Sequence, residues 1–139
     1  MVDADSVYSK LGRLDSLLAV LEDVRTRGER AVVSDVHVQL EAERALQVSI
    51  QICIDLGAHL ISELGLKPPE DYQSVFASLA QAGVIEPDLA ARLADAAGLR
   101  NLLVHDYGEI DHQRLWGTLG ELDDLRDFAK AVEAVARDA

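Results

Sequence analysis

A long apolar segment, residues 34–65, limits most strongly what this chain can fold into. It begins at Ser34 or Asp35, both of which favour the N-cap of a helix, and reaches Gly65, a residue typical of the position just after a helix. Its apolar residues fall on almost every side of a helix: Ala45, Leu46, Ile50, Cys53, Leu56, Leu60, Ile61 and Leu64. A small bundle does not easily cover such a helix. The segment therefore favours an all-α fold and a homodimer.

The rest of the chain predicts further helices separated by short breaks. Gly28 interrupts the first pattern, Pro68 and Pro69 cannot continue a helix, and Pro87 suits the first turn of a new one. The expected helices cover about 3–26, 34–65, 71–82, 87–105 and 111 to the C-terminus. We see no strand alternation and no repeat. The sequence predicts a single domain, residues 1–139, folded as an antiparallel helical bundle of about five helices.

Composition limits the compartment and the partners. Hydrophobic residues make up 49% and charged residues 27%, which is typical of a soluble globular protein. No apolar run approaches the roughly 20 residues that span a bilayer, and the acidic N-terminus does not resemble a signal peptide. A single cysteine, Cys53, fits a reducing cytoplasm. We therefore expect a cytoplasmic protein that does not enter a membrane.

The net charge of −12 argues against a protein that holds DNA or RNA by its overall field. Any RNA contact must be local, made by a few grouped cations, and an acidic surface also suits a basic protein partner. Arg25, Arg27 and Arg30 form one such group, which is either an RNA-guiding patch or a solvated connection. His37, His59 and His112 show no metal-ligand spacing, so no metal site and no cofactor are assigned.

A polar stripe runs along the apolar segment. Arg44, Gln47, Gln51 and Asp55 follow one another at spacings of three and four, so they share one face of a helix. The stripe either faces solvent, as in most helices, or lines a polar cleft or a subunit interface. The pattern alone leaves both interpretations open.

The stretch RNLLVHDYGEID, Arg100 to Asp111, places reactive side chains beside an apolar run. Asn101 and His105 are four apart and share a helix face, close enough for the amide to bond the imidazole. Arg100 and His105 are five apart, or about 140° around a helix, and do not point the same way. A helix that ends near His105, or a second copy across a two-fold axis, would reunite them. Tyr107 would align with Arg100 if the helix persisted.

These side chains could carry out phosphoryl transfer without a metal. A guanidinium stabilises charge on a phosphate, an imidazole moves protons near neutral pH, and RNA supplies its own nucleophile in the 2′-hydroxyl. The alternative is that His105 caps a helix end and Arg100 pairs with an acid, as cations near helix C-termini often do. The spacing by itself does not decide between them.

Three longer stretches resemble the HepT family, the HEPN-domain toxins encoded beside a minimal nucleotidyltransferase antitoxin. LEAERALQVSIQICIDLGAHL is similar to that family's second helix, and ELGLKPPEDYQSVFASLAQAGVI to its loop and third helix. LRNLLVHDYGEID is similar to its Arg-x4-His-x-Tyr signature, here Arg100, His105 and Tyr107, with Asn101 after the arginine. Gln51 departs from the pattern, because many relatives carry an acid there.

The resemblance implies an all-α homodimer whose two signatures meet in a shared cleft. It also implies a toxin–antitoxin system of type VII, metal-independent endoribonuclease activity, and a cognate nucleotidyltransferase antitoxin that can transfer AMP to Tyr107. Arg100 and His105 would be catalytic. The supporting residues would be Asn101, Tyr107, Arg44, Gln51 and Asp55. The competing hypotheses are a non-catalytic interaction protein and a substrate-binding subunit for the nucleotidyltransferase.

Overall fold

The fold is described by a computed structural model, which covers residues 3–105 and 110–138. Within these ranges it contains seven helices where the sequence predicts about five. They are α1 (Ala4–Thr26), α2 (Glu29–Ser34), α3 (Val36–Glu63), α4 (Ser74–Gln81), α5 (Pro87–His105), α6 (His112–Leu119) and α7 (Leu122–Arg137). The described residues form no strand, so the predicted all-α fold is confirmed.

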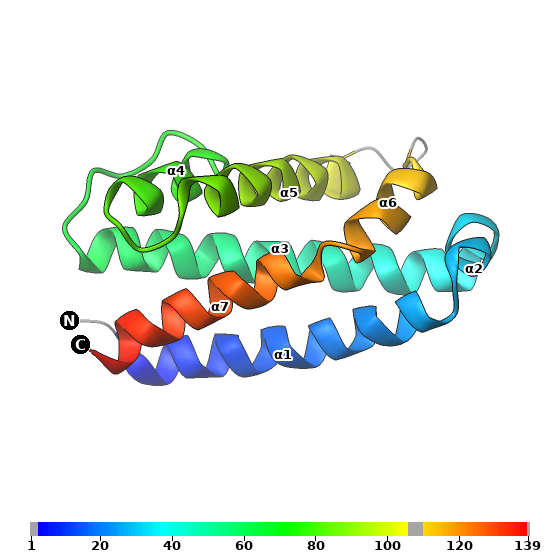
Figure 1. The fold of residues 1–139 in the computed structure, drawn as a ribbon, viewed down its shortest axis with the longest axis horizontal. Coiled ribbons are helices and arrows are strands. Elements are labelled where there is room, and N and C mark those ends of the chain that lie inside the picture. Colours follow the sequence, from blue (N-terminus) through cyan, green and yellow to red (C-terminus); the bar gives the residue numbers. More distant parts are fainter. Residues whose placement is uncertain (1–2, 106–109, 139) are drawn as a thin grey trace.

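The helix α3 runs through the middle of the molecule (Figure 1). The pair α4 and α5 lies on one side of it, and the pair α1 and α7 lies on the other. The short helices α2 and α6 pack together near the end at which α3 begins, and the two chain termini lie near the opposite end. Because α3 contacts every other helix, the core is built around it.

The ends of α3 follow from its sequence. The Asp35 carboxylate accepts a hydrogen bond from the backbone N–H of His37 at 2.9 Å, which caps the helix start. At the other end Gly65 has a positive φ of 70°, and the N–H of Leu66 donates to the carbonyl of Ile61 at 3.0 Å. Both predicted boundaries of this helix are therefore correct within two residues.

By length and composition, α3 could cross a membrane, since its most apolar stretch has a mean hydropathy of 1.3. The expectation that no apolar run approaches a membrane span is wrong in this respect. The core helix of a helical bundle meets the same two criteria. Here Leu46, Ile50, Ile54 and Leu60 are buried among the other helices, so α3 is the core helix of this bundle.

The extra helices arise at two glycines. Gly28, with a φ of 93°, turns the chain out of α1, and the single turn-and-a-half of α2 follows before Asp35 adopts an extended conformation. The predicted C-terminal helix is divided at Gly120, whose N–H donates to the carbonyl of Gly117 at 3.1 Å. This break lets α6 bury Leu115 and Leu119 against α1 and α2, while α7 lies along α1, α3 and α5.

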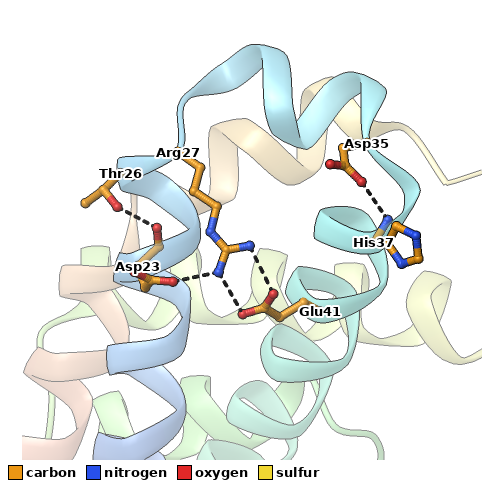
Figure 2. Close-up of polar contacts among 6 residues, drawn as sticks. All are labelled: Asp23, Thr26, Arg27, Asp35, His37 and Glu41. Carbon is orange, nitrogen blue, oxygen red and sulfur yellow. Dashed lines mark hydrogen bonds and ion pairs between the residues drawn. The ribbon is translucent and has the colours of Figure 1, made fainter.

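A polar junction holds α1 to α3 beyond the core (Figure 2). The Arg27 guanidinium donates to Asp23 at 2.7 Å and to Glu41 at 3.2 Å, and these two carboxylates raise the pKa of Arg27. Arg25 lies 3.9 Å from Glu22. Acidic side chains already neutralise the charges of Arg25 and Arg27. This segment is therefore better explained as a solvated connection than as an RNA-guiding patch.

Gly57 lies where α3 packs tightly against α4. A Cβ atom there would lie 2.5 Å from Cγ1 of Val75, whereas a Cβ on Gly12 of α1 would meet nothing within 4 Å. Overpacking costs about 1–3 kcal/mol, which exceeds the roughly 0.5–1 kcal/mol that alanine gains over glycine in a helix. We expect Gly57→Ala to lower the free energy of unfolding and Gly12→Ala to raise it. Urea denaturation measures both, and equal stabilisation by the two variants would contradict this packing.

The Cys53 thiol is fully buried, and burial raises its pKa from 9.0 to about 12. Between these values the unfolded thiol ionises and the folded one does not, so stability falls as pH rises through this window. We expect the native protein to resist thiol reagents at mildly alkaline pH and the urea-unfolded chain to react fully. The modification is measured as a gain in protein mass. Fast modification of the native protein would show that Cys53 is accessible and would contradict its burial.

Candidate functional site

The last turns of α5 carry the signature residues. The predicted bounds of this helix, 87–105, agree with the structure, and Leu99 and Leu103 are buried and hold its end in the core. Arg100 is half-buried, and His105, the last residue of α5, is exposed. Tyr107 lies outside the described residues, so its role stays a prediction.

An open groove of about 610 Å³ lies against this end of α5. One wall belongs to α5 and the other to the connection that precedes α4. The lining residues are Arg100, Asn101, Val104 and His105 on α5, and Asp71, Tyr72 and Gln73 on the connection. The groove therefore brings three of the predicted site residues, Arg100, Asn101 and His105, to one surface of a single protomer.

Arg100 and His105 line one groove although they are five residues apart on α5. Arg100 and His105 point about 140° apart on α5, yet both line this groove because it extends over the whole arc between them. Asn101 and Val104 fill that arc. Neither a disrupted helix nor a second copy is needed to place the guanidinium and the imidazole on one surface.

Arg100 is held by neutral partners. Its Nη1 donates to Oδ1 of Asn101 at 3.0 Å, and its guanidinium carbon lies 5.3 Å from the centre of the Tyr72 ring. Its Nε is buried and has no hydrogen-bond partner, and no carboxylate of residues 3–105 or 110–138 forms an ion pair with it. The alternative in which Arg100 pairs with an acid thus finds no support in the described chain. A guanidinium without a counter-ion can bind a phosphate.

Asn101 orients Arg100 and not His105. The sequence suggested an amide–imidazole bond, but the Asn101 carboxamide oxygen accepts from Arg100 instead. Among the described residues, no hydrogen bond joins Asn101 to His105. His105 is exposed and lines the groove, so a ligand can reach its imidazole.

The facing wall was not identified from the sequence, which predicted a helix from residue 71. The helix starts at Ser74, and Asp71 lies in the turn before it, accepting from the Ser74 N–H at 2.8 Å and the Ser74 hydroxyl at 2.6 Å. These bonds lower the pKa of Asp71. Gln73 ties the wall to α5 by donating to the Ala94 carbonyl at 3.4 Å. The sequence signal for this wall was a tyrosine beside an aspartate in a proline-rich loop.

The polar stripe of α3 does not line the groove. Arg44 and Asp55 are exposed, and the Gln51 amide donates to Asp55 at 2.8 Å. The Gln51 carbonyl oxygen is buried without a partner among the described residues. The supporting roles of Arg44, Gln51 and Asp55 stay predictions, and a solvent-facing stripe and a subunit interface both remain compatible with these positions.

The start of α6 is fixed near α3. Asp111 caps this helix by accepting from the N–H groups of Gln113 and Arg114, as the sequence predicted. His112 Nε2 lies 3.4 Å from a Glu43 carboxylate oxygen on α3. Within the described chain, no three histidine, cysteine or acidic side chains gather as a metal site. Metal independence itself stays a prediction.

The chain matches known proteins in sequence. The family model for HepT-like ribonucleases matches residues 14–132. A tRNA nuclease HepT from Aphanizomenon flos-aquae is 36% identical over 86 residues, which is 60% of this chain and 57% of that protein, so the match spans little more than half of this relative. An mRNA nuclease HepT from Shewanella oneidensis is 26% identical over 94% of this chain and 98% of its own length.

A solved structure shares the fold over nearly the whole chain. It is the tri-AMPylated Shewanella oneidensis HEPN toxin in complex with MNT antitoxin, 26% identical, with a TM-score of 0.86 over 96% of this chain and 99% of that one. Since the family model extends over most of the bundle, the chain belongs to the HepT-like ribonuclease family.

Proposed function

We propose that this protein is the cytoplasmic toxin of a HEPN/nucleotidyltransferase toxin–antitoxin pair and that it cleaves RNA in the α5 groove. The observation that carries the proposal is the state of Arg100. Its guanidinium faces an open groove together with His105 and has no carboxylate partner in the described chain. Such a site suits an anion that arrives from outside the protein, and an RNA phosphate is one.

The groove residues can begin cleavage by internal transfer. His105 takes the proton of a ribose 2′-hydroxyl, and that oxygen attacks the adjacent phosphorus. The bond to the 5′-oxygen of the next nucleotide breaks, leaving a 2′,3′-cyclic phosphate. Arg100 stabilises the negative charge that builds on the phosphate oxygens during the attack. The leaving oxygen must receive a proton from a second donor.

A homodimer can provide that donor. A second copy of the chain brings a second His105, so that one imidazole can act as base while the other acts as acid. The chain also carries apolar residues that the bundle leaves uncovered: Leu40 on α3 is 61% exposed and Leu102 on α5 is 41% exposed. The Glu43–His112 contact brings the start of α6, which follows α5 along the chain, to the early turns of α3. An interface around these leucines would bury apolar surface beside the groove.

The relatives support the ribonuclease and the partner. Two of them are named as nucleases of tRNA and mRNA, and the structural relative is an AMPylated toxin bound to an antitoxin. For this chain we propose a nucleotidyltransferase partner that uses ATP. The Tyr107 oxygen would attack the α-phosphorus of ATP, pyrophosphate would leave, and the tyrosine proton would pass to solvent. The added phosphate could then pair with Arg100 and occupy the place of the RNA phosphate.

A non-catalytic binding subunit is the second candidate, and the net charge of −12 favours it, since an acidic surface suits a protein partner. Both functions can coexist in one toxin. The two functions predict different growth of cells that overproduce the chain without the nucleotidyltransferase. A ribonuclease should arrest growth, and a binding subunit should not.

Replacing His105 tests the catalytic role. We expect His105→Ala to lower the rate of RNA cleavage by about a hundredfold or more, since a general acid or base contributes roughly 10²–10⁴. His105 is exposed, so helix content and melting temperature should not change. His37→Ala, at an exposed position on α3, is the matched control and should cleave at the parental rate. Parental cleavage by His105→Ala would remove this residue from the mechanism.

Charged substitutions test the dimer. We expect Leu40→Glu and Leu102→Glu to shift the protein from dimer to monomer in light scattering and to lower RNA cleavage, because each puts a carboxylate into the proposed interface. Leu64→Glu is the control, since Leu64 is 44% exposed at the far end of α3 and should leave the dimer intact. A parental protein that is monomeric at micromolar concentration would contradict the proposal.

Tyr107→Phe tests the modification. We expect the parental chain, incubated with the partner nucleotidyltransferase and ATP, to gain AMP in whole units of mass and to lose cleavage while staying folded. Tyr107→Phe should gain no mass and keep its cleavage, because the hydroxyl is not needed to move protons in this scheme. Tyr8→Phe, an exposed tyrosine on α1, should be modified like the parental chain. Modification at another residue would refute the assignment of Tyr107.

A further inference from the structure

Tyr72 is an exposed aromatic residue on a surface that also carries charged and amide side chains. It is 46% exposed, lines the groove, and directs its ring toward the Arg100 guanidinium at 5.3 Å. The ring is not part of the core, to which α4 contributes Val75, Phe76 and Leu79. The fold therefore does not depend on this aromatic ring being at position 72.

The groove differs in charge between its two walls. The α5 wall presents Arg100 and the imidazole of His105, whereas the opposite wall presents the Asp71 carboxylate, whose pKa is lowered by its bonds to Ser74. A phosphate is attracted to the first wall and repelled by the second. A ligand that spans the groove must therefore place its anionic part on α5 and an uncharged part on Tyr72.

An RNA nucleotide has this distribution of charge. Its phosphate is anionic, and its base is a flat, neutral ring that stacks on aromatic side chains and guanidinium planes in single-stranded RNA complexes. Both hydrogen bonds from Ser74 go to Oδ1 of Asp71, and the carboxylate has further lone pairs that can accept from a base N–H. The Gln73 amide donates to the Ala94 carbonyl and so links this wall to α5.

We propose that Tyr72 forms a nucleobase-stacking subsite, which places the neighbouring RNA phosphate against Arg100 and His105. This subsite rests on the proposed function, since it binds part of the same RNA. It makes the groove selective for unpaired RNA, because a base inside a duplex cannot lie flat on Tyr72. Asp71 sets the direction of the nucleotide in the groove by excluding its phosphate from this wall.

The test compares two uncleavable probes on the full-length protein. The first is a short single-stranded RNA in which every 2′-hydroxyl is methylated, and the second is the same ribose-phosphate chain without bases. Binding is followed by fluorescence anisotropy. We expect Tyr72→Leu to weaken binding of the first probe by about tenfold or more, as for the loss of one stacked base, and to change binding of the second by much less. Tyr72→Phe, which keeps the ring, should bind both probes like the parental chain.

The control variant is Tyr8→Leu, because Tyr8 is 45% exposed on α1 and does not line this groove. It should bind both probes normally, and all variants should keep the parental melting temperature. Equal weakening of the two probes by Tyr72→Leu would mean that Tyr72 only holds Arg100, and would overturn the subsite. If the parental chain binds neither probe, the RNA-binding function fails first and the subsite fails with it.

Discussion

Burial of α3 is the interaction on which the rest of the structure depends. This helix is apolar on nearly all sides, and α1, α2, α4, α5, α6 and α7 all pack on it (Figure 1). The packing is close where Gly57 lets Val75 of α4 approach the backbone. Because α4 and α5 are both seated on α3, the connection before α4 and the end of α5 come to face each other. The groove between them is thus a consequence of the core.

The same arrangement explains why reactive side chains lie beside an apolar run on α5. Leu99 and Leu103 point into the bundle and hold the helix end, and Leu102 is left exposed. Arg100, Asn101 and His105 occupy the opposite arc and face the groove. A rigid helix anchored by its apolar face can hold a guanidinium and an imidazole at a fixed separation. Catalysis by charge stabilisation and proton transfer needs such a fixed arrangement.

Local signals predicted much of the fold. Periodicity and capping residues placed α5 at 87–105, offered Ser34 or Asp35 as the cap of α3, and indicated Asp111 as the cap of α6; the structure has Asp35 and Asp111. The break at Gly120 and the short helix α2 were missed, because they depend on how α6 and α2 pack against α1 rather than on the residues alone. The groove wall at Asp71 and Tyr72 was missed for a similar reason. Only the tertiary fold brings it to Arg100, which is 28 residues further along the chain.

The chemistry of the RNA ends tests the central claim most directly. A defined single-stranded RNA is cleaved by the purified protein in EDTA, and the new termini are identified by mass spectrometry. Attack by the 2′-hydroxyl, with Arg100 and His105 as the acting groups, predicts a 2′,3′-cyclic phosphate on one fragment and a 5′-hydroxyl on the other. Fragments ending in a 3′-hydroxyl and a 5′-phosphate, or cleavage that requires a divalent ion, would contradict this account.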